Sequence, residues 1–285
     1  MKYEKYKDLY TQFLISEKNL SRNSVLNYLV DLDQFFVTQD TKVSDLNTNV
    51  KLYISNLRKK NLKTSSVNRK ISTLKNFLKF LHTEKKIQQI DIQLFQSLSS
   101  LKKIPRALSK LQMEQIFKDL YNSKQTNKEI YILVLKLIYF SGVRISEALN
   151  LKWSDINNQD NSIYVYGKGS KERKVFIIRD LLVQFKNLKE KNKFVFSIKK
   201  KKISARSVNK FLENCYKNST INVKLSSHIF RHSFATTMLE NNADIRHIQK
   251  LLGHSSISTT EIYTKVAKNM KKKVIDSYHP LKNKL

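Results

Sequence analysis

Apolar residues recur at three- and four-residue spacing through the first hundred positions of the chain. This is the period of an α-helix with one buried face. Three runs show it most clearly: Tyr6 to Leu14, Val25 to Phe36 and Val67 to Leu81. Ser21 and Thr64 stand before the second and third runs, where a hydroxyl oxygen can cap the first turn. The pattern predicts a bundle of about four helices, with these two residues as N-caps.

The helical period breaks in the string SLSSLKKIPRALS, residues 97–109. Pro105 disfavours a helical backbone at Ile104, and small polar residues precede it. We expect a linker over residues 99–108. It would separate a helical domain, residues 1–98, from a second domain, residues 109–285, whose first helix begins at Ser109.

The second domain combines helix and strand signals. The strongly apolar run Ile130–Phe140 predicts a core helix that ends at Gly142. Residues 162–166 and 174–178 are rich in β-branched and aromatic side chains, and GKGSKER between them predicts a hairpin. A further short strand is expected at residues 194–196. Other helices are expected at residues 204–217, 227–241, 244–252, 256–262 and 267–277. The fold class is therefore mainly α, with a small antiparallel β-sheet in the second domain.

The net charge of the chain indicates what kind of partner it binds. The chain has 54 Lys and Arg against 23 Asp and Glu, a formal net charge of +31, which suits binding to a polyanion. A lysine-rich composition, as AT-rich DNA encodes, accounts for part of this excess. No apolar run reaches the roughly 18–20 residues that span a bilayer, and the N-terminus has no apolar signal core. The lone Cys215 excludes an internal disulfide. We expect a soluble, cytoplasmic protein without a membrane partner.

Candidate chemistry for a phosphodiester begins at the end of the core helix. Metal-free phosphoryl transfer needs fixed cations at the phosphate, a nucleophile, a base and an acid. Arg144 lies in SGVRISEALNLKW at an expected helix start, and Glu147 follows one turn later, placed to orient it. Lys168 lies in the hairpin turn, where a lysine can protonate a leaving oxygen. Taken singly, the first pair is also an ordinary surface ion pair, and Lys168 an ordinary turn lysine.

Two histidines and an arginine open the helix expected at 227–241. His228 and Arg231 are one turn apart behind Ser226 and Ser227, which are expected to cap the helix. His232 follows His228 by four residues, a spacing that metal sites use. However, the glutamate of the HExxH pattern is missing and the neighbours are basic, so we expect no metal.

The C-terminal region adds two more candidates. His254 follows Gly253 in LLGH, and Tyr263 follows in STTEIYTK. Alone, such a histidine is often only a partner of a helix C-terminus, and such a tyrosine is usually a core or surface residue.

Together these residues, in this order and context, resemble the tyrosine recombinase (phage integrase) family, and most closely its Xer members. The resemblance is carried by SGVRISE, GKGSKER, HIFRHSFAT and LLGHSSISTTEIYTKV, and more weakly in the first domain by LISEKNLSRNSVLNYLVDLDQFF and SSVNRKISTLKNFLKFLHTEK. Ser227 is a departure, since Xer proteins often have proline before the motif histidine.

The resemblance implies a role for each candidate. Tyr263 attacks the scissile phosphate and becomes joined to a 3′-phosphate. His228 assists proton transfer from Tyr263, and Lys168 protonates the departing 5′-oxygen. The phosphate is bound by Arg144, Arg231 and His254, with Glu147 in support. No metal or nucleotide cofactor is implied, because the phosphotyrosine ester retains the bond energy.

The resemblance also implies an assembly. A helical core-binding domain and a mixed α/β catalytic domain form a clamp around double-stranded DNA. Strand exchange passes through a Holliday junction in a tetramer, either of one protein or with an Xer paralogue. An apolar stripe in the final segment would dock a helix into the neighbouring subunit, unless that helix folds back on its own core. The stripe comprises Val266, Met270, Val274 and Ile275.

The implied role is resolution of chromosome dimers at cell division, with a cell-division DNA translocase as a candidate partner. Two alternatives stay open: an integrase of a mobile element, and a catalytically inactive DNA-binding protein. A type IB topoisomerase uses similar chemistry, but the tetramer-type tail argues against it. The compact length favours an Xer-type enzyme over an integrase with an additional arm-binding domain. The sequence does not specify the DNA target, because base readout depends on docking geometry.

Overall fold

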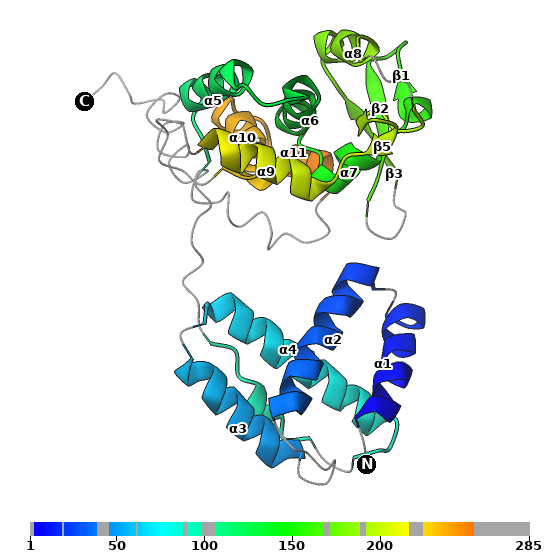
Figure 1. Ribbon diagram of the computed structural model, residues 1–285, viewed down its shortest axis with the longest axis vertical. Helices are drawn as coiled ribbons and strands as arrows, with labels where there is room; N and C mark the ends of the chain where they lie inside the picture. The colour runs from blue at the N-terminus through cyan, green and yellow to red at the C-terminus, as the bar shows by residue number, and fades with distance from the viewer. Residues whose placement is uncertain are drawn as a thin grey trace, which may run out of the picture. The chain divides into compact units, whose positions relative to one another are not determined.

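The computed structural model describes residues 3–18, 20–38, 46–60, 62–87, 90–98, 107–167, 172–188, 192–216 and 225–253. The chain divides into two compact units, Met1–Lys103 and Ile104–Leu285, each with its own hydrophobic core. The division falls inside the expected linker. The predicted fold class is confirmed, since helices dominate both units and the small antiparallel sheets lie in the second (Figure 1).

The first unit is helical throughout its described part. Its elements are α1 Glu4–Ser16, α2 Arg22–Thr38, α3 Leu46–Lys59, α4 Thr64–Thr83 and the short 3-10 helix η2 Ile92–Phe95. The long helix α4 packs against α2, α3 and η2, and its apolar face lies in the core with Phe77 at 1% exposure. Each of the three predicted runs forms a helix. None of the described helices is long and apolar enough to cross a membrane.

One of the two helix caps expected in this unit is confirmed. The Ser21 hydroxyl accepts the Ser24 backbone N–H at 3.4 Å, at the start of α2. The prediction for Thr64 is wrong. The N-cap of α4 is Lys63, whose backbone is extended (ψ 133°), and Thr64 is already the first helical residue. The helix therefore begins one residue earlier than the hydroxyl signal indicated.

A buried acidic side chain joins two helices of the first unit. Asp31 of α2 is 1% exposed. It accepts hydrogen bonds from Lys70 Nζ at 2.9 Å, from Thr73 Oγ1 at 3.3 Å and from Arg69, all on α4. These contacts compensate the burial of its charge and fix α2 against α4.

The second unit is built around the predicted core helix, α6 Lys128–Ser141. It packs against α5 Lys110–Asn122, α7 Ile145–Asn150, α8 Arg179–Lys186, α9 Ala205–Tyr216 and α10 Ser227–Glu240. Helix α5 begins next to Ser109 as expected, and Ser109 is its N-cap: the hydroxyl accepts the Gln112 N–H at 3.2 Å in a reciprocal capping box. Before it, Leu108 is buried in this core and donates its N–H to Ser233 Oγ at 2.9 Å. The end of the expected linker thus packs with the second unit.

The expected hairpin forms within a three-stranded antiparallel sheet. Strands β1 Ile156–Asn157, β2 Ser162–Tyr166 and β3 Glu172–Phe176 pair in that order. Strand β3 begins two residues before the prediction, because Tyr166 pairs with Glu172 at the turn end of the ladder. It also ends earlier, since Ile177 donates its N–H to the Asn161 carbonyl outside the ladder. The two-residue strand β1 gave no sequence signal.

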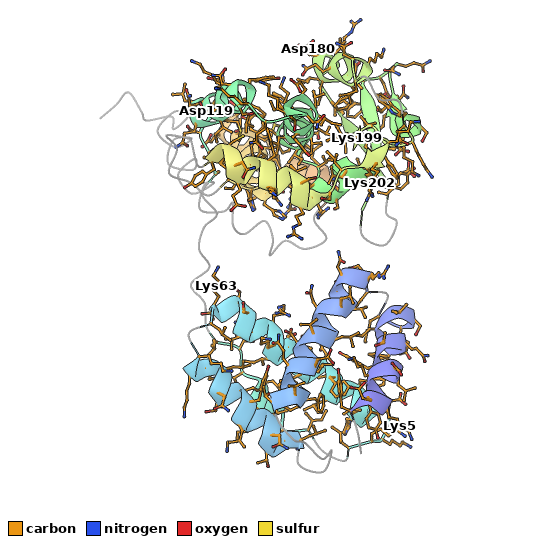
Figure 2. All side chains as sticks on the ribbon, in the orientation of Figure 1. Lys5, Lys63, Asp119, Asp180, Lys199 and Lys202 are labelled. Carbon is orange, nitrogen blue, oxygen red and sulfur yellow. The ribbon has the colours of Figure 1, made fainter. Side chains whose placement is uncertain are left out.

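The strand predicted at residues 194–196 is wrong. Phe194 makes only an isolated bridge with Lys152, and the chain pairs next as a small hairpin, β4 Ser197–Ile198 with β5 Lys201–Lys202. The apolar side chains of this segment enter the core without forming a ladder. The lysines of the hairpin are exposed, as Figure 2 shows for the labelled Lys199 and Lys202.

Three C-terminal helices match their predicted ranges within a residue or two: α9, α10 and α11 Ile245–Leu252. The expected serine caps of α10 are confirmed only in position, since Ser226 is the N-cap residue and Ser227 the first helical residue. Ser226 has the extended backbone of an N-cap but its side chain accepts no capping hydrogen bond within the described residues, and the Ser227 N–H donates to Asn209 Oδ1 at 3.3 Å. The helices expected at 256–262 and 267–277, and the apolar stripe of the final segment, lie outside the described residues.

Candidate active site

The polypeptide turns sharply where the core helix α6 ends, as predicted for Gly142. This residue has a left-handed backbone (φ +66°), and its N–H donates to the Ile138 carbonyl at 2.9 Å. A Cβ atom here would lie 2.5 Å from two ring carbons of Phe234 and 2.9 Å from Leu252. Glycine is required because the backbone conformation disfavours L-residues and the space is already filled. The turn places Arg144 at the N-cap position of α7.

Glu147 is buried, at 4% exposure, and binds two arginines. Its carboxylate accepts the Arg144 backbone N–H at 2.7 Å, which caps α7, and also the Arg144 Nη1 at 2.9 Å. Arg173 of β3 donates Nη1 and Nη2 to the two carboxylate oxygens at 2.9 and 2.8 Å. Such a two-pronged arginine–carboxylate pair is strong and directional. Glu147 therefore fixes both the start of α7 and the Arg144 side chain.

Arg231 approaches the same carboxylate from α10. It is 7% exposed, and its Nη1 lies 3.9 Å from Glu147 Oε2. Its guanidinium also donates to the Gly142 carbonyl, and to the Leu252 carbonyl at 2.6 Å. The structure thus brings together three of the residues singled out from the sequence, Arg144, Glu147 and Arg231.

This cluster carries a surplus of positive charge. Three guanidinium groups surround one carboxylate. Burial alone would raise the pKa of Glu147, but hydrogen bonds from Arg173 and from the Arg144 backbone, with the Arg173 charge, hold that pKa below its ordinary value. The carboxylate is therefore ionised at neutral pH and offsets only one of the three cations. The remainder suits a bound anion.

His228 lies one helical turn before Arg231 and is exposed at the start of α10. Its neighbour His232 is more enclosed. Burial, with smaller contributions from the charges of His228 and Arg231, lowers the pKa of His232. The pair differs accordingly: His228 is open to a ligand, whereas His232 belongs to the packed side of the helix.

The last described turn of the chain passes beside the arginines. Gly253 is the C-cap of α11 with a left-handed backbone (φ +62°), and its carbonyl accepts the Arg144 Nη2 at 3.0 Å. The next residue is His254. Three of the predicted site residues, His254, Lys168 and Tyr263, lie outside the described residues, so their predicted roles stay predictions.

Family models match almost the whole chain. The model of the phage integrase family matches residues 106–270, more than half of the sequence, and the model of the phage integrase N-terminal SAM-like domain matches residues 8–85. The chain belongs to the phage integrase family.

Relatives within the family indicate which kind of enzyme this member is. The chain is 34% identical to the tyrosine recombinase XerC of Pediococcus pentosaceus, with 95% of this chain and 97% of the relative covered. It is 35% identical to the tyrosine recombinase XerD of Rickettsia prowazekii, with coverage of 95% and 96%. The predicted resemblance and enzyme class are confirmed: the protein is a site-specific DNA recombinase of the tyrosine type.

A solved structure agrees with the fold. The recombinase is similar to a lambda integrase dimer bound to a core site, with a TM-score of 0.75, 18% identity, and coverage of 92% of this chain and 95% of that one. At this identity the likeness establishes the fold alone.

Sequence reasoning missed Arg173. The hairpin register places it opposite Val165, on the same face of β3 as the buried Val175. A charged residue on the inward face of a strand requires a buried partner. The alternation of inward and outward residues along the strand could have identified Arg173. It was missed because the expected strand began at residue 174, after Arg173.

Proposed function

We propose that the recombinase cuts and rejoins duplex DNA through a covalent 3′-phosphotyrosine at Tyr263. One observation carries the proposal: Arg144 and Arg231, from helix starts far apart in sequence, meet at the buried carboxylate of Glu147. Two guanidinium groups held this way suit the two non-bridging oxygens of a phosphodiester. The position of Gly253 against Arg144 supports a place for His254 beside the same phosphate.

The cleavage step is an in-line displacement at phosphorus. The Tyr263 oxygen forms the new P–O bond and its proton passes toward His228. The P–O5′ bond breaks, and Lys168 gives a proton to the departing 5′-oxygen. Rejoining reverses these transfers when the 5′-hydroxyl of another strand attacks the phosphotyrosine. The number of phosphoester bonds is conserved, so no nucleotide is consumed.

The arginines lower the barrier by placing charge before the reaction begins. Negative charge on the non-bridging oxygens rises in the transition state, and donors already fixed by the protein stabilise it without reorganisation. Removing one such donor typically slows a reaction by about 10²–10³-fold. His254 would donate a further hydrogen bond, and Glu147 supports the arginines.

DNA is the proposed partner, bound by both units. The net charge of +31 provides strong attraction to a polyanion. Structures with the same fold support this: XerH is described bound to its difH substrate, and lambda integrase as a dimer on a core site. We propose a tetramer on DNA, with two units per subunit clamping the duplex, either of this chain alone or with a paralogue.

The proposed biological role is resolution of chromosome dimers at cell division in the cytoplasm, where a cell-division DNA translocase could activate the tetramer. Similarity over nearly full length to both XerC and XerD supports it. The alternative is integration of a mobile element, which the likeness to lambda integrase keeps open at the level of the fold.

A nicked suicide substrate tests the chemistry. Loss of the short 5′-fragment after cleavage traps the protein on the DNA, so a covalent adduct appears on a denaturing gel. We expect the wild type to form the adduct in the presence of EDTA, because the arginines and not a metal supply the charge. Tyr263→Phe should form none.

Tyr166→Phe is the matched control. It removes a hydroxyl from an exposed tyrosine of β2 that has no proposed part in catalysis. Absence of an adduct with the wild type, or its persistence in Tyr263→Phe, would refute the mechanism. For the biological role, sequencing DNA trapped on the protein in cells should give one chromosomal locus. Adducts at the ends of a mobile element would favour the integrase alternative.

A further inference from the structure

Arg173 makes contacts that no role assigned so far explains. It lies on β3 and its side chain is 18% exposed. Nη1 and Nη2 each donate to one oxygen of Glu147, and Nε donates to the Leu251 carbonyl at 3.2 Å. One guanidinium thus joins three segments: the hairpin, the start of α7 and the last turn of α11.

Glu147 is shared evenly between Arg173 and Arg144. Oε1 accepts Nη1 of both arginines, and Oε2 accepts Nη2 of Arg173 and the backbone N–H of Arg144. Without Arg173, each carboxylate oxygen would lose one of its two donors, and of these hydrogen bonds only those from the Arg144 backbone and side chain would remain to orient the carboxylate. The direction in which Arg144 points therefore depends on Arg173.

Arg173 also supports the turn at Gly253. An added Cβ at Gly253 would lie 3.0 Å from Arg173 Nη1 and 3.2 Å from its Cζ, so the guanidinium packs directly against this glycine. The Gly253 carbonyl in turn accepts Arg144 Nη2. The second anchor of Arg144 is thus also held in place by Arg173.

We propose that Arg173 is a positioning residue for cleavage, which aims Arg144 and the turn before His254 at the scissile phosphate. This inference rests on the proposed function. Arg173 acts through Glu147 and Gly253, without contact with the phosphate. Lysine cannot replace it, because a single ammonium cannot span both carboxylate oxygens and the Leu251 carbonyl.

The test compares two scissile linkages at saturating protein. One is the normal phosphate. The other is a methylphosphonate, in which a neutral methyl group replaces a non-bridging oxygen and removes the charge that the arginines offset. On phosphate, Arg173→Gln should slow adduct formation by about 10- to 100-fold, the effect of misplacing a catalytic group by about 1 Å. On methylphosphonate, the rate of adduct formation by Arg173→Gln should be within a few-fold of the wild-type rate.

Two further variants separate positioning from folding. Arg173→Lys keeps the charge, and should show the same loss on phosphate and the same recovery on methylphosphonate. In a Glu147→Gln background, Arg173→Gln should slow adduct formation much less than it does in the wild-type protein, because both substitutions act on the same carboxylate. Lys174→Gln is the matched control. It removes the same charge from the next residue of β3, whose partner is the half-buried Asp160, and should leave both rates unchanged.

An equal loss on both linkages would overturn the inference and make Arg173 a structural residue. An unchanged rate on phosphate would overturn it as well. Failure of the proposed function looks different, since the wild type itself would then form no Tyr263-dependent adduct on phosphate.

Discussion

Replacing Gly142 by alanine should destabilise the second unit through two separate costs. The left-handed backbone (φ +66°) disfavours any L-residue by about 1–2 kcal/mol. The new methyl group would also lie 2.5 Å from the Phe234 ring. Relieving that overlap in a packed core costs about 1–3 kcal/mol. The sum, about 2–5 kcal/mol, is a large part of the roughly 5–15 kcal/mol that stabilises a typical domain.

Gly253→Ala provides the matched comparison. The backbone is nearly the same (φ +62°), but the nearest atom to the new methyl group is Arg173 Nη1 at 3.0 Å, so relief requires only a small shift of that guanidinium rather than of a packed ring. This variant should therefore show little beyond the backbone cost of about 1–2 kcal/mol. The difference between the two variants isolates the crowding against Phe234.

Urea unfolding followed by tryptophan fluorescence measures both changes. Trp153 is the only tryptophan in the chain and packs against the core of the second unit, so the signal reports that unit. If Gly142→Ala and Gly253→Ala differ by less than about 0.5 kcal/mol, the range of harmless substitutions, the packing argument is wrong.

Two other predictions concern the site. Arg231→Ala should slow adduct formation by about 10²–10³-fold with DNA binding mostly kept, as gel-shift titration against the wild type would show; an equal loss of binding would make Arg231 an affinity residue. The folded-state pKa of His232 is lowered, so below its ordinary pKa of about 6.5 the unfolded chain binds more protons, and stability falls as pH drops from 7.5 to 5.5. His232→Gln should make this decline shallower in urea titrations at each pH, and an unchanged slope would contradict the assignment.

Elements with a strong local signal were predictable from the sequence. The core helix, its stop at Gly142 and the helix start at Ser109 each depend on residues close in sequence, and each is confirmed. The cap predicted at Thr64 is wrong, because a hydroxyl side chain favours the N-cap position but does not determine which residue occupies it. The strand predicted at residues 194–196 failed for a similar reason: its apolar side chains are buried by packing rather than by pairing.

The residues of the candidate site also differ in whether a local sequence signal identifies them. Motifs identified Arg144 and Arg231, and one-turn spacing identified Glu147. Arg173 is paired with Glu147 across 26 residues of sequence, and no local rule connects the two positions. Its role became visible only when the hairpin register placed it on the inward face of β3.

The hydrogen bonds that hold Arg144 and Arg231 join residues far apart in sequence, which determines when they can form during synthesis. Arg144 is held by a carbonyl 109 residues later, and Arg231 by one 89 residues earlier. During synthesis the Gly142 carbonyl is already present, but the Gly253 carbonyl that holds Arg144 and the Leu252 carbonyl that also holds Arg231 are absent until the ribosome has passed Gly253. A nascent or truncated chain therefore carries its positive charge well before it can direct that charge at a phosphate.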